Sequence, residues 1–145
     1  MTTEIRPVES DDGLRYELRI EAPPAIVWRS WTEADRLVRW MGKVATVDLR
    51  EGGEVRVDYG QGDVVTGTYT AIEPDQRLAF TWGWETPDGR MEAGWVEVEL
   101  EALDGGVATL LRLHHGGLDA PSRKSHAEGW DHFLPRLVEA VASGA

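Results

Sequence analysis

The feature that most constrains this chain is a long region in which apolar and polar residues alternate. From Val44 to His115 the period is two, which is typical of strands that bury one face. A further predicted strand, 14–21, alternates in the same way. Because short turns join the segments after residue 44, we predict an antiparallel meander. Glycine, proline and aspartate divide that meander into six predicted strands: 44–50, 54–59, 64–73, 77–84, 91–101 and 107–115.

Helical patterns lie on either side of the meander. Pro23 and Pro24 end the first predicted strand, and proline is well placed to open a helix. Two short helices are therefore predicted before residue 44. A long helix is predicted over about 126–142, beginning at a capping box in 125–128. Its apolar stripe has six residues at helical spacing: Trp130, Phe133, Leu134, Leu137, Val138 and Val141.

These elements predict an α+β fold in which a seven-stranded antiparallel sheet wraps around the long C-terminal helix. Such a sheet has one apolar face, and the long helix is the element available to cover it. Because the curvatures of a sheet and a helix differ, we expect space between them. Concave and mostly apolar spaces of this kind are where small molecules bind.

Composition narrows the functions open to the chain. The 145 residues, 41% of them hydrophobic, predict one domain over 1–145 with a core of about 14–142. The absence of cysteine excludes thiol catalysis, disulfides and cysteine-ligated zinc. A net charge of −11 disfavours nucleic acid and anionic membrane surfaces as partners. Since the sequence has neither a membrane-length apolar run nor a signal-peptide core, we expect a cytoplasmic protein.

Several short motifs are similar, in order and spacing, to those of one known family. They are the segment 22–28 (Ala-Pro-Pro-Ala-Ile-Val-Trp), Trp40, the segment 48–53 (Asp-Leu-Arg-Glu-Gly-Gly), the segments 67–69, 72–74, 77–78 and 81–82, His115 with Gly117, and Gly129 with Trp130. Over about 14–141 the chain resembles the activator of heat-shock-protein-90 ATPase homologue family, within the START-like (SRPBCC) superfamily. The resemblance implies a helix-grip fold with a hydrophobic cavity. It implies no single function, because the superfamily includes lipid binders, polyketide cyclases, hormone receptors and chaperone activators.

A hydrophobic small molecule, lipid-like or aromatic and polyketide-like, is the predicted ligand. Trp82 and Trp84 alternate along one strand and therefore face the same way. Trp40 and Met41, from the second short helix, are placed near the mouth of the cavity. The residues predicted to contact the ligand are Trp82, Trp84, His115, Trp130, Phe133, Trp40, Met41 and Tyr69.

The histidines are assigned by their positions in the predicted elements. His115 has the inward parity of its strand, whereas His114 points to the other face. Two interpretations of His115 stay open: a group that orients a ligand oxygen, or a structural histidine with satisfied hydrogen bonds. His126 and His132 are about 120° apart on the long helix and are expected to face solvent.

Two alternatives to ligand binding are considered. A cyclase or dehydratase needs an inward acid or base, and His115 with Tyr69 is the candidate set; the sequence has no nucleophile motif, metal motif or cofactor motif. The resemblance also implies a chaperone partner. In the eukaryotic activators this fold is joined to a second domain that makes much of the chaperone contact, and 145 residues leave no room for it. We therefore rank chaperone contact below ligand binding.

A homodimer is also predicted, through the outer face of the sheet. Trp95 and Leu110 lie on the faces opposite the inward residues of their strands. Two apolar side chains on neighbouring strands can form one exposed patch, and such patches mark interaction sites.

Overall fold

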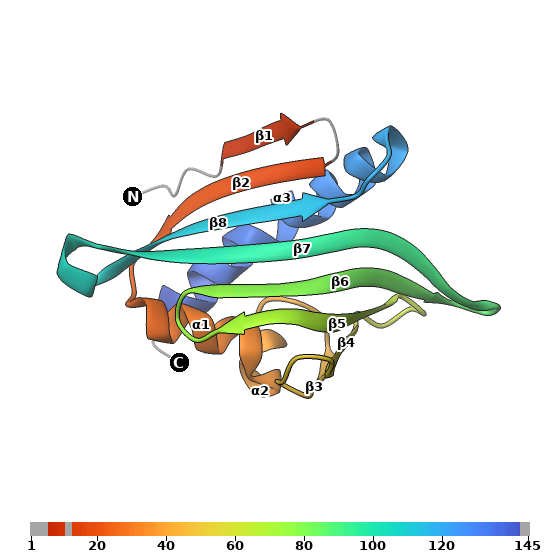
Figure 1. The fold of residues 1–145 in the computed structure, drawn as a ribbon, viewed down its shortest axis with the longest axis horizontal. Helices are drawn as coiled ribbons and strands as arrows, with labels where there is room; N and C mark the ends of the chain where they lie inside the picture. Colours follow the sequence, from red (N-terminus) through yellow and green to blue (C-terminus); the bar gives the residue numbers. More distant parts are fainter. Residues whose placement is uncertain (1–5, 11–12, 143–145) are drawn as a thin grey trace.

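A computed structural model describes residues 6–10 and 13–142 of the chain (Figure 1). One antiparallel sheet has the strand order β1-β2-β8-β7-β6-β5-β4-β3, and the long helix α3 crosses one face of it. The predicted helix-grip architecture is thus confirmed. The strands are β1 (Arg6–Ser10), β2 (Gly13–Ile20), β3 (Val44–Val47), β4 (Glu54–Asp58), β5 (Val64–Glu73), β6 (Arg77–Thr86), β7 (Gly89–Leu103) and β8 (Ala108–Gly116). The helices are α1 (Pro24–Thr32), α2 (Ala34–Leu37), the 3-10 turn η1 (Asp104–Gly106) and α3 (Ala120–Ala142).

The sheet contains one strand more than the seven predicted. The additional strand, β1, pairs with β2 in a register that runs from Arg6 opposite Glu17 to Ser10 opposite Gly13. Residues 6–10 are mostly polar, so they show no apolar alternation. An edge strand needs only backbone hydrogen bonds to its neighbour, which is why the sequence pattern did not reveal it.

The helix α3 begins at Ala120, six residues before the predicted start. A carboxylate oxygen of Asp119 accepts a hydrogen bond from the backbone N–H of Ser122 at 2.9 Å, as an N-terminal capping residue does. The predicted capping box at 125–128 is therefore wrong, since it lies inside the helix. Its Ser125 hydroxyl instead donates to the Ser122 carbonyl at 3.2 Å. The first turns of α3 are polar, so the apolar stripe does not extend to the true start.

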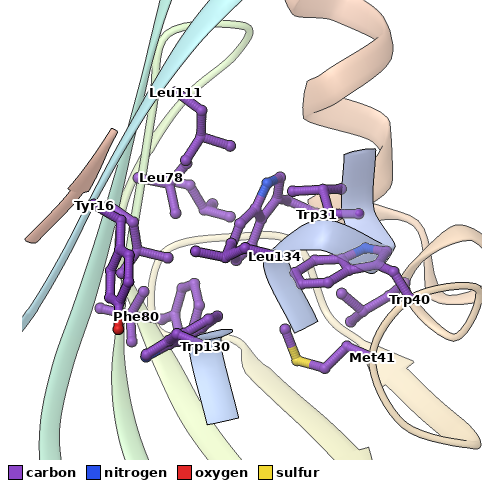
Figure 2. Packing of buried hydrophobic residues seen from close by; sticks show 14 of the residues in the cluster. Tyr16, Trp31, Trp40, Met41, Leu78, Phe80, Leu111, Trp130 and Leu134 are labelled. Carbon is purple, nitrogen blue, oxygen red and sulfur yellow. The ribbon is translucent and has the colours of Figure 1, made fainter. Parts of the chain in front are cut away.

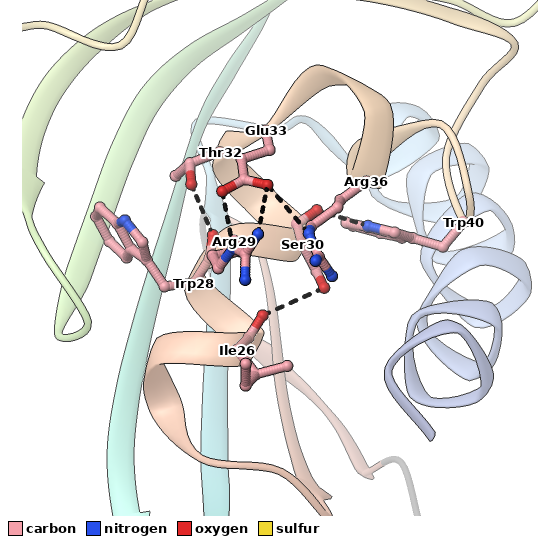
Figure 3. Close-up of polar contacts among 8 residues, drawn as sticks. All are labelled: Ile26, Trp28, Arg29, Ser30, Thr32, Glu33, Arg36 and Trp40. Atoms are coloured by element: carbon pink, nitrogen blue, oxygen red, sulfur yellow. Dashed lines mark hydrogen bonds and ion pairs between the residues drawn. The ribbon is translucent and has the colours of Figure 1, made fainter. Parts of the chain in front are cut away.

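The helices α1 and α2 close one end of the sheet. Glu33, between them, accepts hydrogen bonds from Arg29 at 2.8 Å and from Arg36 at 3.0 Å (Figure 3). The indole N–H of Trp40 donates to the Ser30 carbonyl at 2.8 Å, which fixes the segment after α2 against α1. Figure 2 shows Trp40 beside Trp31 and near Leu134 of α3. This end is thus filled by aromatic and aliphatic side chains from three helices.

The outer face of the sheet carries the two apolar residues predicted there, but they do not meet. Trp95 is 42% exposed and Leu110 is half-buried. On the paired strands β7 and β8, Trp95 lies opposite Gly116, whereas Leu110 lies opposite Glu101. Six residues along a strand correspond to about 20 Å, so the two side chains form no single patch. The homodimer through this face stays a prediction that rests on Trp95 alone.

No helix within residues 6–10 and 13–142 is both long and apolar enough to cross a bilayer.

A candidate ligand cavity

A cavity of about 540 Å³ lies between the sheet and the N-terminal half of α3. This volume is within the range typical of small-molecule sites. Met91 lines it with 57% of its surface exposed and therefore marks its mouth. The sheet contributes Val64, Trp82, Trp84, Glu85, Thr86, Met91, Glu92 and Ala93, the β4–β5 turn contributes Tyr59 and Asp63, and α3 contributes Ser122, Ser125, His126, Gly129, Trp130 and Phe133.

Five aromatic rings form a continuous belt around this cavity. Trp82 and Trp84 alternate along β6, so both indoles project from the inner face of the sheet. The centroid of Trp82 is 5.5 Å from that of Trp130 and 6.0 Å from that of Trp84. The belt continues from Trp84 to Tyr59 at 5.8 Å and from Tyr59 to Phe133 at 5.3 Å. These are ordinary distances for favourable aromatic pairs, and they give the cavity a mainly aromatic wall. These five rings form what is called the aromatic belt below.

His115 lies behind the belt and does not line the cavity. It is fully buried, and the indole N–H of Trp130 donates to its Nδ1 at 3.0 Å. An indole N–H can only donate, so Nδ1 is the acceptor and Nε2 carries the proton, which it donates to the Ala93 carbonyl at 2.7 Å. Burial lowers the pKa of His115 to about 4, against the opposing effect of the Ala93 hydrogen bond. Both ring nitrogens are engaged, so His115 holds Trp130 in place and has the geometry of a structural histidine.

A bulge in β7 presents that carbonyl to His115. Between the pairs Thr81–Trp95 and Gly83–Glu92, Trp82 lies opposite two residues, Ala93 and Gly94. Gly94 has a φ of +76°, and a Cβ there would lie 1.8 Å from a backbone oxygen of β8. Only glycine fits this position.

His126 lines the cavity, contrary to the expectation that it faces solvent. The indole N–H of Trp84 donates to its Nε2 at 3.1 Å, and its Nδ1 is 2.8 Å from the Ser122 carbonyl. Because Nε2 accepts from Trp84, the proton is on Nδ1 and is donated to that carbonyl. His126 therefore fixes the rotamer of Trp84 as His115 fixes that of Trp130. The rings of the two histidines are 4.8 Å apart.

Besides His115, three of the predicted ligand contacts lie outside the cavity. Trp40 is fully buried among α1, α2 and α3, so it is not at the mouth. Met41 and Tyr69, both 2% exposed, line a separate void of about 20 Å³. The reason is that the segment after α2 folds inward against α1 and does not cover the cavity. Trp82 borders both spaces.

The polar groups of the cavity are acidic or neutral. Asp63, Glu85 and Glu92 line it, and the described lining residues include no lysine or arginine. Glu85 is bonded to Arg56 at 2.9 Å, and Glu92 is paired with Arg90. The indole N–H of Trp82, a residue 5% exposed, has no hydrogen-bond partner among the described residues. An unpaired buried donor is unfavourable by about 1–3 kcal/mol, so an acceptor oxygen next to it would be stabilising.

Comparison with known proteins identifies the family. The sequence profile of the family described as "Activator of Hsp90 ATPase homolog 1-like protein" matches residues 21–142. The chain belongs to this family. No curated protein matches the chain.

Solved structures of this fold family are similar to the chain over most of its length. CalU16 from Micromonospora echinospora is 28% identical with a TM-score of 0.74, over 97% of this chain and 87% of that one. DynU16, a protein of the dynemicin biosynthetic locus, is 27% identical with a TM-score of 0.74, over 93% of this chain and 49% of that one. The Aha1 dimer from Colwellia psychrerythraea, at 19% identity and a TM-score of 0.74 over 88% of this chain and 93% of that one, shows the fold alone.

Sequence reasoning missed most of the residues that line the cavity, among them Tyr59, His126 and Gly129. In the sequence, Gly129 stands out only as part of a family motif with Trp130, whereas Trp130 is also predicted to contact the ligand. A helical signal was present, because Ser122, His126, Gly129 and Phe133 fall at the spacing of one helix face. Three of them, Ser122, His126 and Gly129, are small or polar, so a search for an apolar stripe does not find them.

Proposed function

We propose that this protein binds a hydrophobic small molecule, aromatic or lipid-like, in the cavity between the sheet and α3. The observation that carries the proposal is the aromatic belt around about 540 Å³ of unfilled space. A well-packed protein interior contains few voids larger than a water molecule, so a space of this size is a binding site by default. The biosynthetic locus of the relative DynU16 supports a small molecule as the occupant.

The chemistry of the cavity favours a ligand that is mostly apolar with one or two oxygens. Apolar surface removed from water contributes about 25 cal/mol per Å², less the cost of ordering the ligand. Ser122 and Ser125 line the helix side, and a hydroxyl group can bond a ligand oxygen. Acidic residues line the rim, and the described lining residues include no basic side chain that would hold a phosphate or a carboxylate.

The arrangement supports binding more than catalysis. A general base needs a free nitrogen or carboxylate within reach of the ligand. The carboxylates among the lining residues, Asp63, Glu85 and Glu92, are exposed at the rim, and Glu85 and Glu92 are paired with arginines. His115 and His126 each have both ring nitrogens engaged with protein groups. The candidate acid–base set of His115 and Tyr69 is not assembled at the cavity, since neither residue lines it.

Tryptophan fluorescence quenching with a panel of lipids, polyphenols and polyketide-like aromatics tests the proposal. We expect at least one compound to bind below about 1 mM, which corresponds to about −4 kcal/mol. Trp82→Ala should weaken that binding several-fold, because it removes part of the aromatic wall. Trp95→Ala is the matched control: it removes an indole from the outer face of the sheet, 42% exposed, and should leave affinity unchanged. No binding by any compound would refute the proposal.

Family membership favours a second candidate, contact with a chaperone of the Hsp90 type. The test is the ATPase rate of such a chaperone with and without the protein. A rate that is unchanged at saturating concentrations would remove this candidate and leave ligand binding in place.

A further inference from the structure

Gly129 is an unusual residue for its position in α3. It lies in the interior of a 23-residue helix, where glycine is among the poorest helix formers. It lines the cavity, and a Cβ built on it would meet nothing within 4 Å. Packing against the sheet therefore does not require glycine here, in contrast to Gly94, where a backbone oxygen excludes any side chain.

The consequence of Gly129 is a bare stretch of helix backbone inside the aromatic belt. Ser125 and Phe133, one turn before and one turn after, both line the cavity. Gly129 is therefore the position without a side chain on a helix face whose neighbouring residues carry one. Across the cavity stand the indoles of Trp82 and Trp84. Both are held in place from the α3 side, Trp82 by contact with Trp130 and Trp84 by its bond to His126. The space between the two indoles and the helix backbone at Gly129 is thus a slot with two rigid sides. This space is called the slot below.

We infer that Gly129 is a specificity-determining residue of this cavity, and that it admits the edge of a flat, fused aromatic ring system. The inference rests on the proposed function. A flat ring can contact the indoles and the helix backbone together, and a rigid ligand loses little conformational entropy on binding. A flexible alkyl chain loses more rotational freedom and gains no aromatic contact. Any side chain at 129 projects into the slot and shortens it.

Isothermal titration calorimetry with two neutral probes, 1,8-dihydroxyanthraquinone and 1-decanol, tests this inference on the whole chain. Wild type should bind the anthraquinone at least tenfold more tightly than the alcohol. Gly129→Leu should weaken anthraquinone binding at least tenfold, and Gly129→Ala should weaken it by a smaller factor. Glu128→Leu is the matched control, because it adds the same side chain one residue away at an exposed position and should bind as wild type does.

Thermal melting followed by circular dichroism distinguishes two causes of weaker binding: a side chain at position 129 that fills the slot, and a variant that does not fold. Gly129→Ala should melt at a higher temperature than wild type while binding less well, since alanine favours the helix. Equal anthraquinone affinity in wild type and Gly129→Leu would overturn the role of Gly129 and leave the proposed function standing. Tighter binding of 1-decanol than of the anthraquinone would overturn the flat-ligand class. Binding of neither probe at 1 mM would overturn this inference, and failure of the wider lipid and aromatic panel would overturn the proposed function as well.

Discussion

The two halves of α3 face the same sheet but leave different interiors. The C-terminal half packs solidly: Leu134 and Leu137 are fully buried, and Trp31 and Trp40 close the space beside them (Figure 2). The N-terminal half carries serine, histidine and glycine on its sheet-facing side and leaves the cavity. Both halves lie close to tryptophans. The difference shows that the size of the helix residues, and not the number of aromatic residues, decides where the interior is hollow.

Hydrogen bonding differs between these two halves as well. At the solid end the indole of Trp40 donates to a backbone carbonyl in α1. At the hollow end the indoles of Trp84 and Trp130 donate to histidines, each of which donates in turn to a backbone carbonyl. The histidines hold these two rings in place beside the open space. An aromatic wall beside an open space requires such support.

The largest expected effect is at the boundary between the two halves, in Trp130→Ala. Trp130 is 3% exposed, and truncating a buried tryptophan typically reduces stability by about 3–5 kcal/mol. The change also removes the donor to Nδ1 of His115. Urea denaturation measures the loss, with Trp95→Ala as the exposed control that should lose under about 1 kcal/mol. A loss that small in Trp130→Ala would show that this residue does not couple the two halves.

The next largest expected effect is a pH dependence of the stability, caused by His115 beside the hollow half of α3. The pKa of His115 is lowered to about 4 in the folded protein, so the unfolded chain binds its proton first as the pH falls below about 6.5. Stability therefore falls between about pH 6.5 and pH 4, by roughly 3 kcal/mol for this group.

Carboxylates titrate in the same range, so the measurement is the difference from His115→Gln at each pH. The stability advantage of wild type over His115→Gln should shrink as the pH is lowered from 7 to 4. A constant advantage across that range would mean that burial does not hold His115 neutral.

A smaller effect compares two truncations in α3, one at a tightly packed residue and one at a residue that borders the cavity. Leu137→Ala opens a hole in the solid half and should reduce stability by about 3 kcal/mol. Phe133→Ala removes a half-buried ring that already borders open space, and should reduce stability by about 1 kcal/mol. Thermal and urea melts of the two variants give the difference. Equal losses would indicate that the surroundings of Phe133 are as tightly packed as those of Leu137.

The smallest effect is a gain in stability. Gly129→Ala should stabilise the protein by up to about 1 kcal/mol, because the added methyl group enters open space and alanine favours helix. Urea denaturation measures this gain directly. A destabilised Gly129→Ala would show that the hollow is smaller than the structure indicates.

The elements that could be predicted from the sequence are those with a strong apolar period. The strands from Val44 onward and the stripe from Trp130 to Val141 follow from alternation and helical spacing, and they fix the helix-grip architecture. Strand β1 and the first six residues of α3 could not be predicted in this way. Both are polar, and both are held by backbone or capping hydrogen bonds that leave no period in the sequence.

For the candidate site, the sequence alone determined which residues share a face: Trp82 with Trp84, and Trp130 with Phe133. That information is local, since it depends only on the periods of strands and helices. Only the tertiary structure decided that Trp40, Met41 and Tyr69 lie away from the cavity while Tyr59, His126 and Gly129 line it. Which face meets which neighbour, and whether side chains fill the space between them, depends on contacts between residues far apart in the chain, and no local period records those contacts.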